Sequence, residues 1–273
     1  MQLQSYDPGN FYDELFSAPG QPRPQAAPLI DWMGQLSPEI LRQHHETAQI
    51  ALFNLGVTFR VYNDDQGVER IFPVDIIPRI IAEAEWRSLE KGLKQRIKAL
   101  NCFLTDIYGP QNIVKDGIVP LDIVESASGI LKPCIGINPP AGVWCHITGT
   151  DLVRDGEGKW FVLEDNLRVP SGISYVLENR RVMKSTFPDM FQTIPIQPVD
   201  SYPSQLLETL LNLAPPHLVA PVVVVLTPGI NNSAYFEHSF LAQQMGVELV
   251  EGRDLVVADG YLQLRTTKGL QRV

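Results

Sequence analysis

In TDLVRDGEGKWFVLEDNLRVPSG, residues 150–172, two strand-like runs flank a glycine-containing bend. The second run places Glu164, Asp165 and Asn166 directly after a series of apolar residues. Aspartate and glycine favour a tight reversal of the chain, so the segment predicts an antiparallel hairpin. We expect a four-residue loop, Asp155 to Gly158, which would place Arg154 opposite Lys159.

The predicted register gathers oxygen-bearing side chains. Because side chains alternate between the two faces of a strand, one face is expected to carry Asp151, Val162, Glu164 and Asn166, and the other Asp165. Asp151 and Glu164 would be diagonal neighbours, with Cα atoms about 7–8 Å apart. Two carboxylates and an amide oxygen suit Mg²⁺ or Mn²⁺. The alternative is a surface hairpin with solvated acids.

Composition limits the classes of function. The chain has 273 residues, of which 44% are apolar, and 22 Lys+Arg against 31 Asp+Glu give a formal net charge of −9. This balance argues against non-specific nucleic-acid binding. Cys102, Cys134 and Cys145 lack the CxxC spacing of a zinc site, and the longest apolar run, residues 218–226, is too short to span a membrane. The predicted location is the cytoplasm, with no membrane partner.

Shifts in composition divide the chain into four segments. Residues 1–30 are expected to be a flexible arm, because residues 17–28 are rich in proline and polar residues. Residues 31–186 form the predicted main domain, with a helix over 38–55 and a helical apolar stripe between 78 and 108. Residues 187–204 are too proline-rich for regular structure and are expected to be a linker.

The last predicted domain, residues 205–273, has the pattern of an incomplete α/β unit. It begins with a helix over 205–213 and the strand PVVVVL, followed by the loop TPGINN and a helix over 233–245. The strand VELV and a hairpin turning at Asp259-Gly260 follow.

The helical segment between residues 78 and 108 carries a row of cations that could meet an anionic ligand or form a solvated face: Arg87, Lys91, Lys94 and Lys98.

Longer sequence words add a resemblance to a known family. An aspartate followed thirteen residues later by Glu-x-Asn at a strand end is similar to the metal-binding hairpin of ATP-grasp ligases. The words FPVDIIPRIIAEAEW, GLKQRIKALNCFLTDIYG and TPGINNSAYFEHSFLAQQMGVELVEGRDL resemble the circularly permuted ATP-grasp branch related to glutathionylspermidine synthase. This similarity extends from about residue 12 to the C-terminus.

The resemblance implies a fold and an activity. The implied fold class is mixed α/β: an ATP-grasp-like subdomain with an antiparallel metal-binding hairpin, followed by the start of a Rossmann-like preATP-grasp domain. The implied activity is an ATP-dependent carboxylate–amine ligase using Mg²⁺ or Mn²⁺, with small-molecule or peptide substrates. In such enzymes a lid covers the nucleotide, and it would follow Val273, so this chain alone is expected to hold half an active site. The alternative is a non-catalytic module that binds a protein partner.

The resemblance also assigns residues. Asp151, Glu164 and Asn166 match the metal ligands, with Glu164 bridging two ions, and Arg168 matches a residue that contacts the phosphoryl group. Glu164 and Arg168 are thus the expected catalytic residues. Ser171 is expected to be either a turn residue or a hydroxyl that contacts phosphate. The candidate substrate contacts, for which structural roles are an open alternative, are Arg79, Gln95, Arg96, Tyr235, Glu237 and His238.

Overall fold

The computed structural model describes residues 6–60, 69–71, 73–168, 170–215 and 218–273. The chain divides into two compact units, one formed by residues 1–80 with 171–273 and the other by residues 81–170. Both helices and small sheets occur, so the fold is mixed α/β as predicted. These units do not follow the boundaries expected at 187–204, and the domain division stays a prediction.

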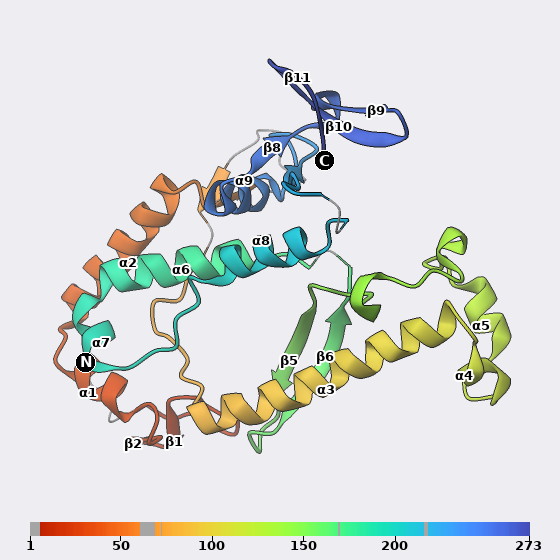
Figure 1. The fold of residues 1–273 in the computed structure, drawn as a ribbon. Coiled ribbons are helices and arrows are strands. Elements are labelled where there is room, and N and C mark those ends of the chain that lie inside the picture. Colours follow the sequence, from red (N-terminus) through yellow and green to blue (C-terminus); the bar gives the residue numbers. More distant parts are fainter. Residues whose placement is uncertain (1–5, 61–68, 72, 169, 216–217) are drawn as a thin grey trace. The chain divides into compact units, whose positions relative to one another are not determined.

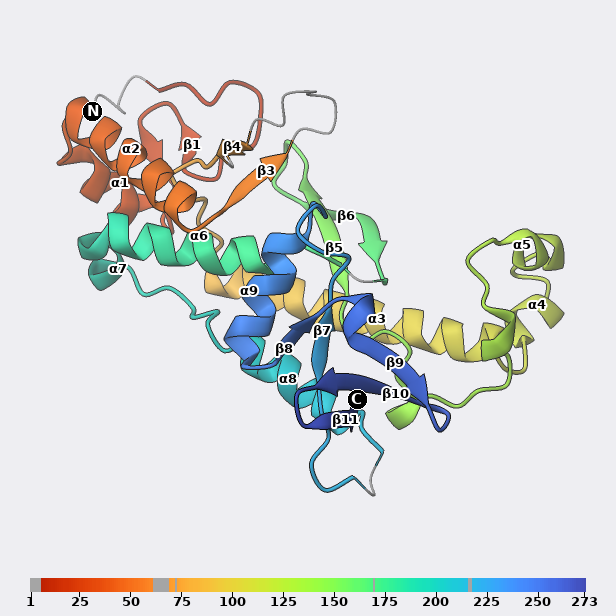
Figure 2. The ribbon, with the colours of Figure 1, turned by 90° about the horizontal axis from the view of Figure 1, so that it is seen from above.

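The unit of residues 81–170 is built on one long helix and one hairpin. Helix α3 (Glu83–Ile107) runs beside strands β5 (Gly149–Arg154) and β6 (Trp160–Asn166), as Figures 1 and 2 show. Gly92 does not interrupt α3. The short helices α4 (Asn112–Lys115) and α5 (Leu121–Ser126), with 3-10 turns at 132–134 and 140–142, connect α3 to the hairpin.

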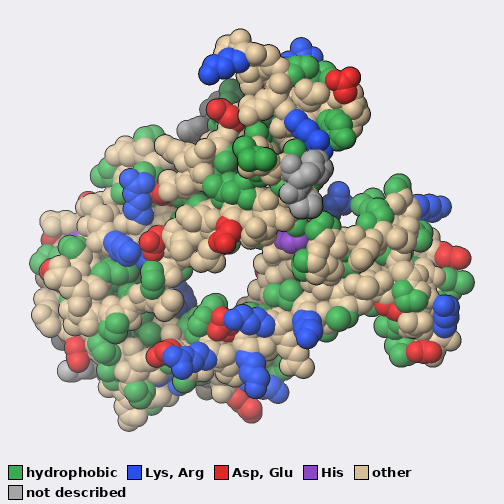
Figure 3. Space-filling view, viewed as in Figure 1, with side chains coloured by type: hydrophobic (Ala, Val, Ile, Leu, Met, Phe, Trp, Pro, Cys, Tyr) green, Lys and Arg blue, Asp and Glu red, His purple; other side chains and the backbone are tan. Residues whose placement is uncertain are grey.

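The row of cations on α3 is interleaved with acids. Arg87 forms an ion pair with Glu83, and Lys94 lies 2.7 Å from Glu90, each one helical turn apart. Figure 3 shows Lys and Arg side chains mixed with Asp and Glu along the part of the surface that α3 occupies. Exposed pairs of this kind contribute little to stability. These contacts favour the solvated-face interpretation of the row.

The N-terminal segment is more ordered than predicted. Strands β1 (Phe16–Ala18) and β2 (Gln21–Pro22) form a small hairpin, and helix α1 (Ala27–Gly34) begins inside the segment expected to be an arm. Phe16, Ala26 and Ile30 are buried together. The prediction of a flexible arm over 1–30 was wrong here, because its proline-rich composition masked a few well-spaced apolar residues that reach a core of their own.

The main core lies among helices α1, α2 (Pro38–Asn54), α6 (Ile173–Thr186) and α7 (Pro188–Thr193). Its largest fully buried side chains include Leu29, Leu52, Phe187 and Met190. Helix α2 begins as predicted, since the Ser37 hydroxyl accepts the Ile40 N–H at 3.2 Å. The expectation of irregular structure from residue 187 onward was wrong for α7, where a proline occupies a first-turn position that requires no N–H donor.

The C-terminal elements follow the predicted order. Helix α8 (Tyr202–Asn212) precedes β7 (Val224–Leu226), α9 (Tyr235–Met245) and β8 (Glu248–Val250), and β7 pairs with β8 in parallel. Strands β9 (Leu255–Ala258), β10 (Tyr261–Thr266) and β11 (Gly269–Arg272) form an antiparallel sheet. Asp259 and Gly260 both adopt positive φ, 52° and 77°, as a tight hairpin turn requires.

Strands β3 (Thr58–Arg60) and β4 (Glu69–Ile71) pair antiparallel. The sequence NDDQG at residues 63–67, which is typical of a turn, lies between these strands and outside the described residues. Among the described residues, no helix has both the length and the apolar character needed to cross a membrane.

Candidate active site

The bend of the β5–β6 hairpin is one residue longer than predicted. The carboxylate of Asp155 accepts the N–H groups of Glu157 and Lys159, at 3.0 and 2.8 Å, and Gly158 adopts φ 84°. The first cross-strand pair is therefore Arg154 with Trp160 instead of Arg154 with Lys159. If the rest of the ladder were regular, this extra residue would place Glu164 and Asn166 on the face opposite Asp151.

A second irregularity offsets the first. Leu152 pairs with Val162, but the next pair is Asp151 with Glu164, so Leu163 is an extra residue in β6. This is the geometry of a β-bulge, in which two residues of one strand oppose one residue of the other. The predicted register was wrong in detail: Asp151 and Glu164 are direct neighbours instead of diagonal ones, and Val162 lies on the opposite face.

The outer face of the hairpin carries the three predicted metal ligands. Asp151 and Glu164 face each other across the strands and are both exposed. The amide Nδ2 of Asn166, two residues further along β6, donates to Glu164 Oε1 at 3.2 Å, so the two side chains lie on the same face. Directly opposed carboxylates repel one another unless a cation or a proton lies between them.

This set of side chains fits a divalent ion that is shared with another ligand. Among the described residues, no group of three or more His, Cys, Asp or Glu side chains could hold a metal. The outer face instead offers two carboxylates and one amide oxygen, fewer than the six ligands of Mg²⁺. Mg²⁺ commonly completes its shell with water and substrate phosphates. Arg168, two residues after β6, is exposed and could contact such an anion.

The inner face of the hairpin is braced by α3. Asp165 accepts a hydrogen bond from Thr150 at 3.0 Å and forms an ion pair with Arg96 of α3 at 2.6 Å. Glu85 of α3 accepts the Trp160 indole N–H at 2.8 Å and pairs with the guanidinium of Arg154. Arg96, expected to be a substrate contact, is therefore engaged in holding the hairpin.

The remaining candidates lie in separate places. Arg79 pairs with Asp75 at 3.1 Å and is exposed, as is Gln95 on α3. Ser171 is exposed just before α6, in the unit that does not contain Arg168. The structure therefore brings together the three metal-ligand candidates on one hairpin, whereas Arg79 and Ser171 belong to the other compact unit.

The α9 candidates occupy the first turn of that helix. Glu237 is only 5% exposed, and its carboxylate accepts the Gly172 N–H at 2.7 and 2.8 Å and the Ser174 N–H at 3.3 Å. His238 Nδ1 lies 3.0 Å from the Thr227 hydroxyl, and Tyr235 is half-buried. Sequence reasoning missed the partners of Glu237 because they are backbone groups more than sixty residues earlier.

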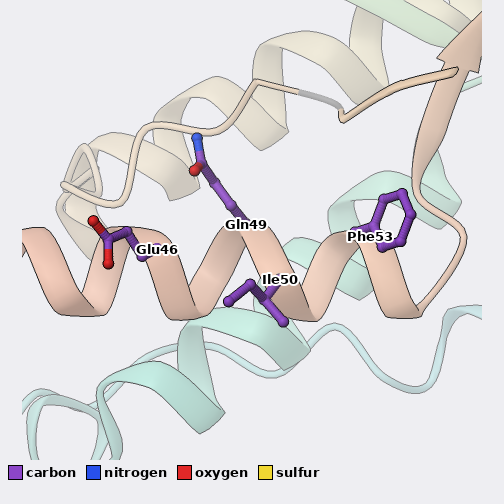
Figure 4. Close-up of a pocket in the computed structure, with 4 residues that line it drawn as sticks. All are labelled: Glu46, Gln49, Ile50 and Phe53. Carbon is purple, nitrogen blue, oxygen red and sulfur yellow. The ribbon is translucent and has the colours of Figure 1, made fainter. Parts of the chain in front are cut away.

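A surface hollow elsewhere is separate from these residues. Four residues of α2 line it: Glu46, Gln49, Ile50 and Phe53 (Figure 4). They follow i, i+3, i+4, i+7 spacing on one helix face and supply a single charged group. None of the predicted site residues lies there, so we place the candidate chemistry at the β5–β6 hairpin.

Comparison with known proteins decides the family. Residues 78–273, which include the whole hairpin, match the family model described as circularly permuted ATP-grasp type 2. The chain belongs to this circularly permuted ATP-grasp family. The resemblance recognised from the hairpin and the longer sequence words is thereby confirmed.

Relatives of this circularly permuted ATP-grasp chain are longer than it is. An uncharacterized protein of Synechocystis sp. is 98% identical over all 273 residues, which cover 57% of its length. An uncharacterized Mycobacterium tuberculosis protein is 47% identical over 262 residues, 96% of this chain and 47% of its own length. A Frankia casuarinae protein named "Putative glutamate--cysteine ligase 2-2" is 43% identical over 264 residues, 96% of this chain and 30% of its own.

A solved structure shares the fold of this ATP-grasp chain. The glutathione synthetase like-effector from Globodera pallida, in its apo form, superposes with a TM-score of 0.50 over 84% of this chain and 56% of its own. The sequence identity is 14%, so the similarity concerns the fold alone.

Proposed function

We propose that the protein is an ATP-dependent carboxylate–amine ligase. A carboxylate oxygen attacks the γ-phosphorus of ATP, ADP leaves, and an acyl phosphate forms on the substrate. The amine nitrogen then attacks the acyl carbon, phosphate leaves with the C–O bond electrons, and the amine loses one proton. The products are an amide, ADP and phosphate.

The observation that carries this proposal is the pairing of Asp151 with Glu164 next to Asn166 on an exposed face. We assign the two carboxylates and the Asn166 amide oxygen as ligands of Mg²⁺ or Mn²⁺, and Arg168 as a contact of the transferring phosphoryl group. A bound divalent ion supplies charge neutralisation for phosphoryl transfer, where electrostatics and positioning account for most of the catalysis. Membership of the family and the ligase name of one relative support the same reaction class.

The hairpin holds the three proposed ligands in place before an ion binds. The α3 brace on the inner face holds Asp165, Trp160 and Arg154, so the alternate side chains of the same strands are held toward the other face. A preorganised ligand set spends less free energy on ordering when an ion binds. The proposed acid and amine substrates are small molecules or peptides, and measurements of ADP release with different acid–amine pairs identify them.

Mn²⁺ binding followed by electron paramagnetic resonance, with and without ATP, tests the metal assignment. We expect Glu164→Gln to weaken Mn²⁺ binding at least about tenfold, because it removes a charged ligand from a set of three. The matched control is Glu157→Gln, which removes the same charge from the exposed bend of the same hairpin.

ADP release in the presence of Mg²⁺, ATP and candidate acid–amine pairs, glutathione with spermidine first, tests the reaction. The amine-dependent rate should fall at least about a hundredfold in Glu164→Gln and be unchanged in Glu157→Gln. Equal Mn²⁺ affinity in Glu164→Gln and the wild type would remove the metal assignment. Mn²⁺ and ATP binding without ADP release for any acid–amine pair would favour the non-catalytic module.

A further inference from the structure

One row of buried residues along helix α6 is mostly polar. The helix buries Ser174, Glu178, Val182 and Thr186, which are spaced four residues apart and so lie along one face. None of the four is more than 4% exposed. Helices α2 and α9 pack against α6. Because fully buried residues are usually apolar, the three polar side chains of this row require partners inside the protein.

The hydrogen-bonding capacity of this row is only partly used. Ser174 Oγ, Glu178 Oε2 and Thr186 Oγ1 are buried and have no hydrogen-bond partner within the ranges that the structure describes. The other carboxylate oxygen of Glu178, Oε1, lies 3.4 Å from Nη1 of Arg181, a side chain that is mostly exposed. A buried oxygen without a protein partner is normally bound to an ordered water or an ion, because leaving it unpaired is costly.

Ser174 and Glu178 form a pair that one small molecule can bridge. They are one helical turn apart, which places their Cβ atoms about 5–6 Å from each other. The Ser174 hydroxyl and Glu178 Oε2 are nonetheless not bonded to each other. Thr186 lacks such a neighbour in the row, because the buried residue one turn before it is Val182. Since a buried water makes about two to four hydrogen bonds, the row offers it a site at Ser174 and Glu178 but not at Thr186.

The donors and acceptors of this pair fit a water better than a metal ion. A carboxylate oxygen can only accept, so the bridging molecule has to donate to Glu178, and the Ser174 hydroxyl can accept or donate in turn. Ca²⁺ and Mg²⁺ take about six or more oxygen ligands, whereas the pair supplies two. Glu237, the other acid beside Ser174, is already bonded to the N–H groups of Gly172 and Ser174.

We propose that one ordered water molecule is bound between Ser174 and Glu178, donating to Glu178 Oε2 and hydrogen-bonded to the Ser174 hydroxyl. The site lies within the unit of residues 1–80 and 171–273 and does not depend on the proposed ligase function. The same serine donates its N–H to Glu237 of α9 at 3.3 Å. The water therefore completes a buried polar connection from Glu237 through Ser174 to Glu178, which fixes the start of α6 against α9.

A crystal structure of the wild-type chain, at a resolution that shows ordered water, tests the site directly. We expect a water within about 3.2 Å of both Ser174 Oγ and Glu178 Oε2. Magnetic relaxation dispersion of water nuclei counts long-lived buried waters in solution. The double variant Ser174→Ala with Glu178→Met should hold one fewer than the wild type, and Thr186→Val should hold the same number. A direct bond between the two side chains, or equal numbers in the double variant and the wild type, would overturn the proposal.

A double-mutant cycle in thermal unfolding measures whether the two side chains share one partner. Ser174→Ala and Glu178→Met should each lower the Tm by about 2–4 °C, because each leaves the water with one partner fewer. The double variant should lose clearly less than the sum. Ser185→Ala is the control, since the Ser185 hydroxyl donates to the Val182 carbonyl at 2.9 Å, and its effect should add to that of Glu178→Met.

Two results of these unfolding measurements would contradict the water site. Additive losses in Ser174→Ala and Glu178→Met would show that the two side chains have no common partner. A wild-type Tm that rises with potassium chloride but not with choline chloride would show that a cation, and not a water, lies between them.

Discussion

Glu164 and Glu237 are acids of the same type that end in opposite situations. Glu164 lies on the exposed face of a hairpin, where its recorded partner is one amide group. Glu237 is buried, and backbone N–H groups already satisfy its carboxylate. Whether an acid can hold a metal ion therefore depends on the donors around it more than on the residue itself, because a carboxylate with its hydrogen bonds filled has fewer lone pairs to offer.

The largest expected effect on stability comes from replacing Gly172, whose N–H binds the buried carboxylate of Glu237. Gly172→Ala places a side chain at φ 108°, which is strained even though no atom lies within 4 Å of the added Cβ. We expect a loss of about 2 kcal/mol in the free energy of unfolding, measured by urea denaturation. Gly252→Ala, at a glycine without positive φ and with the same open surroundings, should cost clearly less. Equal losses would mean that the turn before α6 is not strained.

The two faces of the hairpin should separate under matched substitutions. Asp165→Asn removes the charge that pairs with Arg96, and we expect it to cost about 1 kcal/mol of stability with little change in Mn²⁺ affinity. Asp151→Asn on the outer face should leave stability unchanged or raise it, because it relieves repulsion with Glu164. It should weaken Mn²⁺ binding, because it removes a ligand. Thermal unfolding and Mn²⁺ titration of both variants measure this crossover. Parallel behaviour of the two variants would show that the faces are not functionally distinct.

Asp13 extends the comparison to a third acid, whose partners are one hydroxyl and two backbone N–H groups. Burial tends to raise the pKa of Asp13, but hydrogen bonds from the Tyr6 hydroxyl and from the N–H groups of Phe16 and Leu15 outweigh it, and the pKa lies below its ordinary value. Because the folded-state pKa is the lower one, the charged form adds stability above the unfolded pKa of about 3.9.

The resulting prediction concerns pH. Asp13→Asn should lower the free energy of unfolding by about 1 kcal/mol near pH 7. The difference from wild type should shrink as the pH falls below about 4 and through the folded-state pKa, where Asp13 itself becomes protonated. Urea denaturation at several pH values measures it. A difference that stays constant down to pH 2 would contradict the assignment of these hydrogen bonds to the charged carboxylate.

The smallest expected effect has the opposite sign. Thr186 on α6 is 4% exposed, and its hydroxyl oxygen has no hydrogen-bond partner among the residues that the structure describes. Thr186→Val keeps the shape and removes a buried polar group that lacks a partner, so it should stabilise the fold by about 0.5 kcal/mol. Thr209→Val is the matched control, because the Thr209 hydroxyl donates to the Gln205 carbonyl at 2.8 Å. A loss of stability in Thr186→Val would indicate that the hydroxyl is satisfied by water.

Local signals in the sequence were sufficient for much of the fold. Ser37 caps α2, Gly246 follows α9 with φ 69°, and Asp259-Gly260 forms the predicted hairpin turn, because each feature depends on a few adjacent residues. The presence of a hairpin was predictable, and Asp151, Glu164 and Asn166 lie on one face as expected although the expected register was wrong. A longer bend and an extra residue at Leu163 are both one-residue effects, and their consequences for Glu164 cancel.

Long-range partners could not be predicted in the same way. The burial of Glu237 depends on N–H groups at Gly172 and Ser174, and the engagement of Arg96 depends on Asp165, in each case more than sixty positions away. No spacing rule connects such pairs. Tyr235 and Glu237 were both candidate substrate contacts by sequence. Tertiary packing buries Glu237 and leaves Tyr235 half-buried.

The bulge at Leu163 also bears on how the hairpin tolerates changes in chain length. The pairs on either side of it, Leu152 with Val162 and Asp151 with Glu164, would become consecutive if Leu163 were deleted. Such a deletion yields a regular ladder in which Glu164 still opposes Asp151 and Val162 still faces α3. Deleting Leu152, the partner of Val162, gives no such cancellation, so the loss of one residue should be tolerated at Leu163 and should disrupt the register at Leu152.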